Sequence, residues 1–167
     1  NNLFKGLTMI GTTISHYNII EKLGEGGMGV IYKAQDLSLD RTVAIKFLSS
    51  QLSESPESKA RFLQEARAAA ALNHPNILSV YEIDEQNGQM YFVMEFVDGM
   101  TLRQYISNLT SGTGISVTQA IVWTSQIALG LKAAHEKNIV HRDIKGENIM
   151  VAGDGNLKIM DFGIAKL

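Results

Sequence analysis

The chain has 167 residues, of which 45% are hydrophobic, and its 15 basic and 17 acidic residues give a formal net charge of −2. This balance of charge provides no electrostatic basis for binding nucleic acid or an anionic membrane surface. Cysteine is absent, which excludes disulfides and cysteine-ligated zinc and fits a cytoplasmic location, and no apolar run has the length of a transmembrane helix or the form of a signal peptide.

Residues 1–15 are expected to be an N-terminal extension. Met9 is a candidate native start, which would make residues 1–8 a remnant of a vector or of upstream sequence. Neither composition nor a motif gives this segment a function.

A glycine-rich run over residues 23–31 places Gly24, Gly26 and Gly29 between two apolar, alternating segments. Glycine lets a backbone approach phosphate groups without interference from side chains. Residues 30–34 are β-branched and aromatic, which predicts a second strand, whereas a dinucleotide-binding glycine motif would lead into a helix. The pattern therefore predicts a hairpin lid over phosphates. The alternative is a hairpin turn without a ligand.

The next predicted strand, residues 42–47, alternates between its two faces. Ala44 and Lys46 fall on one face, where a small residue would let a flat base lie close and a cation one pleat further along would meet phosphates. The alternative is a solvated lysine at the edge of a sheet, although the rest of the strand is apolar. The opposite face carries Val43, Ile45 and Phe47.

A helix is predicted after these strands, because Ser55 is a preferred N-cap and Pro56 suits the first helical position. Glu65 lies at the edge of the apolar stripe of this helix. From there it can reach inward and fix the direction of the Lys46 ammonium. The alternative is a solvated Glu65 that pairs with Arg61, one helical turn earlier.

Two polar motifs follow later in the chain, HRDIKGEN at residues 141–148 and DFG at residues 161–163. They resemble the catalytic loop and the metal-binding triplet of protein kinases. The glycine-rich run and the strand with Lys46 resemble the nucleotide-binding parts of the same family. All four motifs occur in the order that the family requires.

The spacings agree with this resemblance. Glu65 follows Lys46 by 19 residues, and Asp161 follows Asp143 by 18. The sequence of the glycine-rich run resembles that of the bacterial eukaryotic-type, or Hanks-type, serine/threonine kinases in particular. Lys145 matches the serine/threonine form of the catalytic loop.

The resemblance covers residues 16–167 and implies an α+β fold of the protein-kinase type. It implies a small lobe over residues 16–95, made of antiparallel strands and one helix. A hinge over residues 96–99 would lead to a partial, helical large lobe over residues 100–167.

The resemblance also implies a role for each motif residue. Asp143 would orient and deprotonate the attacking hydroxyl, with Lys145 near the transferred phosphoryl group. Lys46, held by Glu65, would contact the phosphates of ATP. The other implied sites are the phosphate-covering Gly24, Gly26 and Gly29, the adenine contacts Leu23, Ile31, Ala44 and Met150, the back of the pocket at Met94, hinge backbone groups from Glu95 to Val97, and the Mg²⁺ ligands Asn148 and Asp161.

Because the sequence ends at Leu167, the resemblance leads us to expect a truncated large lobe without an activation segment. The predicted helix over residues 117–137 would then lose its usual cover. Burial of such a face favours self-association, so a homodimer or other oligomer through this helix or the tail 162–167 is expected. The apolar positions concerned are Ala120, Trp123, Ile127, Leu131 and Ala134.

Two functions of different classes are compatible with these residues. The first is an ATP-dependent serine/threonine protein kinase whose activity is weak or limited to autophosphorylation. The second is a non-catalytic nucleotide-binding or interaction module that keeps the motifs without a substrate platform. ATP and Mg²⁺ are the expected ligands, while the protein substrate and the activating signal have no signature in the sequence.

Overall fold

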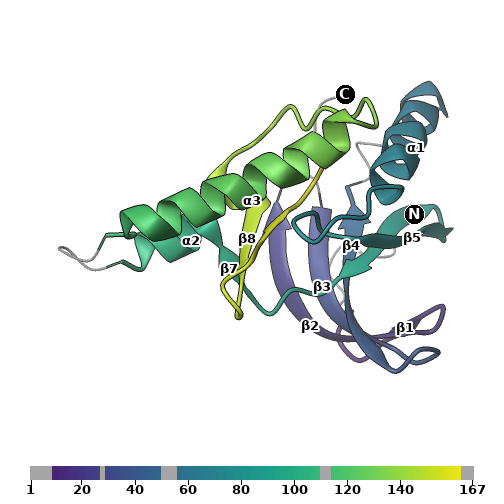
Figure 1. The fold of residues 1–167 in the computed structure, drawn as a ribbon. Helices are drawn as coiled ribbons and strands as arrows, with labels where there is room; N and C mark the ends of the chain where they lie inside the picture. Colours follow the sequence, from purple (N-terminus) through teal and green to yellow (C-terminus); the bar gives the residue numbers. More distant parts are fainter. Residues whose placement is uncertain (1–8, 27–28, 50–55, 110–113, 163–167) are drawn as a thin grey trace. The chain divides into compact units, whose positions relative to one another are not determined.

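The computed structural model describes residues 9–26, 29–49, 56–109 and 114–162 (Figure 1). Several predicted features lie outside these ranges. They are residues 1–8, the tip of the glycine-rich run at residues 27–28, the cap Ser55 and the tail 163–167.

Contacts between residues divide the chain into two compact units. The first unit joins Asn1–Pro56 to Val80–Phe96, and the second joins Glu57–Ser79 to Val97–Leu167. The division after Phe96 falls inside the expected hinge. Residues 57–79 group with the second unit, whereas the resemblance placed them in the small lobe, so the lobe boundaries stay a prediction.

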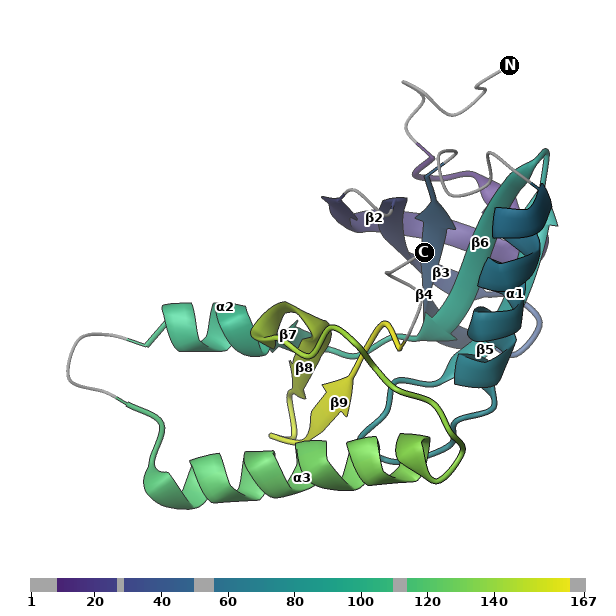
Figure 2. The same ribbon diagram turned by 90° about the horizontal axis from the view of Figure 1, so that it is seen from above.

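The described residues of the first unit form an antiparallel sheet of six strands in the order β1-β2-β3-β4-β6-β5 (Figures 1 and 2). The strands are β1 (Thr13–Ile14), β2 (Tyr17–Gly26), β3 (Gly29–Asp36), β4 (Arg41–Leu48), β5 (Val80–Gln86) and β6 (Gln89–Glu95). β2 and β3 form the predicted hairpin, in which Gly26 pairs with Gly29. β4 lies between β3 and β6, so the strand that carries Lys46 is interior to the sheet.

The predicted alternation along β4 is confirmed. Val43, Ile45 and Phe47 belong to one buried hydrophobic cluster. Ala44 and Lys46 are also buried but lie outside that cluster. The ring of Phe47 packs between the rings of Tyr32 and Tyr91, at centroid distances of 5.9 and 5.6 Å. One face of the sheet is therefore a core, and the other is available for different contacts.

A fully buried carboxylate closes the turn between β3 and β4. Asp36 Oδ1 accepts hydrogen bonds from the backbone N–H groups of Ser38 and Leu39, both at 3.1 Å, and Arg41 Nε donates to Oδ2 at 3.2 Å. Burial alone would raise the pKa of Asp36. The hydrogen bonds from these three partners nevertheless hold the pKa below its ordinary value of 3.8.

The described residues of the second unit form three α-helices and a small sheet. The elements are α1 (Pro56–Ala70), α2 (Leu102–Ser107), α3 (Val117–His135), the 3₁₀ turn η2 (Gly146–Asn148) and the strands β7 (Gly99–Thr101), β8 (Ile149–Ala152) and β9 (Leu157–Ile159). Thr101 caps α2 in a capping box with Gln104, which satisfies two backbone donors at the start of the helix. None of the helices within the described ranges is long and apolar enough to cross a membrane.

α3 buries most of its predicted apolar stripe within its own unit. Trp123 is 5% exposed and packs with Ile149, Val151 and Leu157 of β8 and β9, and its Nε1 donates to the carbonyl oxygen of Gly155 at 3.0 Å. The expectation that this stripe lacks cover is therefore wrong, because β8 and β9 pack against it. Three further positions of the stripe are covered as well. They are Ile127, Leu131 and Ala134, which join a cluster with Ile77, Ile159 and Phe162.

α3 also has exposed apolar residues outside the predicted stripe. Of the stripe itself, only Ala120 is exposed. At 3.6 residues per turn, the larger exposed apolar residues lie about 100–160° around the helix from Trp123. They are Val117, Ile121, Val122 and Leu129, and together they are called the outer face of α3 below.

Candidate functional site

Asp143 lies in a hydrogen-bonded cluster of the second unit. Lys145 Nζ donates to Asp143 Oδ2 at 2.7 Å, and Asn148 Nδ2 donates to the same oxygen at 3.1 Å. Asn148 Nδ2 also donates to the backbone carbonyl oxygen of Asp143 at 2.9 Å. The hydrogen bond from Lys145 to Asp143 raises the pKa of the lysine. The structure thus brings three of the residues predicted from sequence together and fixes the orientation of the carboxylate.

His141 connects this cluster to the segment that contains Asp161. The imidazole is buried, its Nδ1 accepts a hydrogen bond from the backbone N–H of Asp143 at 3.2 Å, and its Nε2 lies 2.7 Å from the carbonyl oxygen of Met160. Because Nδ1 accepts, the ring proton belongs on Nε2, which donates to Met160. The ring of Phe162 packs edge-on against the imidazole at a centroid distance of 4.7 Å.

Two residues next to these contacts adopt left-handed backbone conformations. Arg142 has a φ of 67° and Asp161 a φ of 57°. Such conformations cost about 1–3 kcal/mol each in non-glycine residues and persist where the surroundings hold them. Asp161 is half-buried, and the backbone N–H of Met160 beside it donates to the carbonyl oxygen of Asn148 at 2.9 Å. Asp161 and Asn148 therefore belong to adjoining, connected segments.

Four residues of the expected nucleotide pocket share one face of the sheet in the first unit. Ile31 pairs with Lys46 across β3 and β4, and Ala44 pairs with Met94 across β4 and β6. Directly paired residues project to the same side of a sheet. Lys46 is 5% exposed. Its burial on an interior strand excludes the alternative of a solvated lysine at a sheet edge.

The three glycines of the run differ in what their positions require. Gly24 and Gly26 have open space where a Cβ atom would stand. Gly29 has a φ of 132°, and a Cβ atom there would clash with the carbonyl oxygen of Phe47 on β4. Only glycine fits this position, for a reason that the sequence pattern did not show. Leu23 is 45% exposed and falls within a register shift of the β2–β3 pairing.

The remaining predicted residues lie in several elements. Glu95 ends β6, Val97 follows it and Met150 belongs to β8, and all three are half-buried. Glu65 belongs to α1, but its side chain is outside the described part of the structure. Its pairing with Lys46, and the joint site that the resemblance implies from both units, stay predictions.

Sequence reasoning missed Gln126, which organises a second polar group in the second unit. Its Oε1 accepts hydrogen bonds from the backbone N–H of Leu157 at 2.7 Å and from Asn76 Nδ2 at 3.3 Å, and its Nε2 donates to Asn156 Oδ1 at 3.2 Å. The available signal was an amide side chain inside the apolar stripe of a predicted helix. A polar residue in such a position needs partners from the core.

A strand-rich unit with a glycine hairpin and a second unit with a loop like that of Asp143 are typical of a known class of enzymes, the protein kinases. The family model for the protein kinase domain matches residues 17–167, and the chain belongs to the protein kinase family. The chain is 44% identical to the serine/threonine-protein kinase PrkC of Bacillus subtilis, over 94% of this chain and 24% of that protein. It is also 44% identical to the serine/threonine-protein kinase PknB of Mycolicibacterium smegmatis, over 90% of this chain and 24% of that protein.

Solved structures confirm the expected fold class. The crystal structure of the Mycobacterium tuberculosis PknI kinase domain matches with a TM-score of 0.84 at 30% identity, over 96% of this chain and 62% of that chain. The fold is therefore α+β and protein-kinase-like, and the resemblance to bacterial Hanks-type kinases is confirmed. The chain spans about a quarter of the length of the curated relatives named above.

Proposed function

We propose that the chain binds ATP with Mg²⁺ and transfers the γ-phosphoryl group to a serine or threonine hydroxyl, with activity that is weak or limited to autophosphorylation. The observation that carries this proposal is the Asp143 carboxylate, whose Oδ2 is held by Lys145 and Asn148. Phosphoryl transfer depends mainly on positioning and on neutralising charge, which a fixed carboxylate with a neighbouring cation can supply. The names of PrkC and PknB support the same reaction class.

Asp143 is the proposed proton acceptor. The substrate hydroxyl oxygen forms a bond to the γ-phosphorus, the bond from that phosphorus to the bridging oxygen breaks, and ADP leaves with the electron pair. The hydroxyl proton goes to the Asp143 carboxylate. Lys145 lies against this carboxylate and offsets the negative charge of the transferred group.

The side chains of Asn148 and Asp161 suit a hard cation. Asn148 Nδ2 donates both of its hydrogen bonds to Asp143, which fixes the orientation of the amide. The amide oxygen, Oδ1, would therefore be the atom that coordinates a cation. An amide oxygen and a carboxylate are ligands that Mg²⁺ accepts while it keeps several waters. Bound Mg²⁺ supplies neutralisation of phosphate charge. No group of three or more His, Cys, Asp or Glu residues in the described ranges is arranged to hold a metal ion, so phosphates and waters would complete the coordination.

The sheet face with Ile31, Ala44, Lys46 and Met94 is the proposed nucleotide platform. The small side chain of Ala44 admits the adenine, and Lys46 neutralises phosphate charge one pleat away. The other proposed contacts follow the family pattern, with Leu23 and Met150 on the base, backbone groups of Glu95 to Val97 at its edge, Gly24, Gly26 and Gly29 over the phosphates, and Glu65 holding Lys46.

Thermal unfolding with ATP and Mg²⁺ tests the binding step. A ligand present at a hundred times its dissociation constant adds about 2.7 kcal/mol to the free energy of unfolding, so we expect a clear rise in the unfolding midpoint. Lys46→Met should reduce that rise. Lys132→Met, which changes an exposed lysine of α3, should keep it. An unchanged midpoint at millimolar ATP and Mg²⁺ would contradict the proposal.

Labelled ATP separates the two function classes. Incorporation of phosphate into the chain or a generic acceptor protein supports the kinase reaction, whereas a midpoint shift without any incorporation supports a non-catalytic nucleotide-binding module.

Self-association is part of this proposal, but its surface differs from the one expected. The outer face of α3 exposes Ile121 to 61% and Leu129 to 52%. Burial of apolar area is worth about 25 cal/mol per Å², which favours pairing of two such faces. Light scattering should show a dimer or higher oligomer that Ile121→Glu dissociates. A monomeric mass at high micromolar concentration would exclude it.

A further inference from the structure

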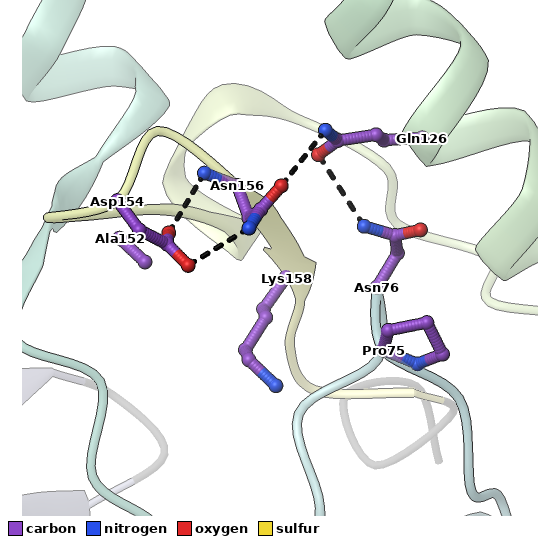
Figure 3. Close-up of a pocket in the computed structure, with 7 residues that line it drawn as sticks. All are labelled: Pro75, Asn76, Gln126, Ala152, Asp154, Asn156 and Lys158. Atoms are coloured by element: carbon purple, nitrogen blue, oxygen red, sulfur yellow. Dashed lines mark hydrogen bonds between the residues drawn. The ribbon is translucent and has the colours of Figure 1, made fainter.

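A cavity of about 410 Å³ opens in the second unit, and none of its lining residues belongs to the Asp143 cluster (Figure 3). Its volume is within the range of small-ligand sites, roughly 300–1,000 Å³. Pro75 and Ala152 contribute apolar surface. The polar lining comes from Asn76, Gln126, Asp154, Asn156 and Lys158.

Hydrogen bonds fix the wall formed by Asn76 and Gln126. Asn76 is 7% exposed, and its Nδ2 donates to the carbonyl oxygen of Leu157 at 2.9 Å and to Gln126 Oε1 at 3.3 Å. Gln126 Oε1 also accepts from the backbone N–H of Leu157. Both hydrogens of Asn76 Nδ2 and both lone pairs of Gln126 Oε1 are thereby used. The wall is preorganised.

The turn between β8 and β9 fixes the opposite wall. Asp154 accepts hydrogen bonds from the backbone N–H of Asn156 at 3.0 Å and from its Nδ2 at 2.8 Å. These two hydrogen bonds lower the pKa of Asp154, and the positive charge of Lys158 lowers it further. Each oxygen of the Asp154 carboxylate therefore holds Asn156 in place, as Figure 3 shows.

Two amides of the lining have a further N–H group. Within the described part of the chain, Gln126 Nε2 donates one hydrogen bond, to Asn156, and Asn156 Nδ2 donates one, to Asp154, so each amide has a second N–H. The Lys158 ammonium has three N–H donors and can bond to a ligand while it keeps another partner. Its side chain lies between the β8–β9 turn and Pro75 in Figure 3.

We propose that this cavity binds the carboxylate group of a ligand. Lys158 supplies the positive charge, and the second N–H groups of Gln126 and Asn156 supply neutral donors, a combination that gives strong charge-assisted hydrogen bonds. Asp154 limits the charge that the cavity tolerates, so a singly charged carboxylate fits better than a phosphate. Pro75 and Ala152 leave room for a short aliphatic chain beside it.

The carboxylate has two possible sources, a free small acid or an acidic side chain of a peptide. NMR titrations of the ¹⁵N-labelled chain with butyrate, which carries a single charge, and with an end-blocked peptide that contains one glutamate distinguish them. We expect saturable shifts in the side-chain amide signals of Gln126 and Asn156 with both ligands, and the tighter ligand identifies the source. Butyramide, the uncharged analogue of butyrate, should give no saturable shift.

Two variants give the decisive comparison. Lys158→Met should weaken binding by about tenfold or more, the loss of one hydrogen bond to a charged group, whereas Lys132→Met should bind as the parent chain does. Gln126→Glu keeps an acceptor oxygen for Leu157 and Asn76 but replaces the donor to Asn156 Oδ1 with a negatively charged oxygen, so it should abolish binding and lower the unfolding midpoint moderately. Equal shifts with butyramide, equal affinity of the Lys158 and Lys132 variants, or no saturable shift with either butyrate or the peptide would overturn the proposal. These readouts need no ATP and no phosphoryl transfer.

Discussion

Lys145 and Asn148 both donate to Oδ2 of Asp143, at 2.7 and 3.1 Å, so one carboxylate oxygen carries a cation and an amide together. In the proposed kinase, Asp143→Asn keeps the shape of this side chain but removes its basicity. General acid–base catalysis contributes about 10²–10⁴-fold, and we expect phosphate incorporation from labelled ATP to fall by that factor. The ATP-induced rise in the unfolding midpoint should persist. Undiminished incorporation would indicate a contaminating kinase or another mechanism.

Gly29→Ala should destabilise the first unit. The left-handed φ of this position costs a non-glycine residue about 1–3 kcal/mol, and the added methyl group also meets the carbonyl oxygen of Phe47. Gly24→Ala is the matched control, because the space around Gly24 is open, and a change within about 0.5 kcal/mol is expected. Urea unfolding of both variants measures the difference. Equal stabilities would show that the hairpin adjusts to a side chain at Gly29.

Trp123→Glu should prevent folding of the second unit rather than dissociate an oligomer. The indole is buried against β8 and β9, and loss of a buried tryptophan costs about 3–5 kcal/mol before the penalty of burying a charge. Ile121→Glu, on the outer face of α3, should remain folded. Circular dichroism of the two variants makes the comparison. A folded, monomeric Trp123→Glu chain would mean that the indole is an interface residue after all.

Asp36 should make the stability of the first unit sensitive to acid. The pKa of this carboxyl is lower in the folded chain than its ordinary value of 3.8, so the folded state binds fewer protons than the unfolded state. Its contribution is fully present above pH 3.8 and is lost as the pH falls through the folded-state pKa. Asp36→Asn should be less stable at neutral pH and lose less stability between pH 5 and pH 3, as urea unfolding at each pH would show. A parallel loss in both chains would contradict this assignment.

The elements could be predicted where local patterns determine them. The alternation along β4 and the start of a helix at Pro56 are local features, and both predictions were correct. The cover of Trp123 could not be predicted, because it comes from β8 and β9, which lie some thirty residues further along the chain. Pattern analysis identifies an apolar stripe but not the segment that packs against it.

The candidate site shows the same division. Asp143, Lys145 and Asn148 were identified because they match the catalytic-loop motif of the family, and the structure places them in one cluster. The backbone partners could not be identified, because the carbonyl oxygen of Met160 has no signature in a side chain. Gln126 was missed for a related reason, since its role depends on three partners that are distant in sequence.

The single imidazole of His141 joins the Asp143 loop and the Met160–Phe162 segment through its two nitrogens and its ring face. If Met160 moves away, His141 loses the partner of its Nε2. The imidazole, whose Nδ1 accepts from the backbone N–H of Asp143, is then held less firmly. The loop of Asp143 and the segment of Asp161 are therefore connected through this one side chain. We therefore expect a ligand that fixes the geometry around one of these carboxylates to restrain the other as well.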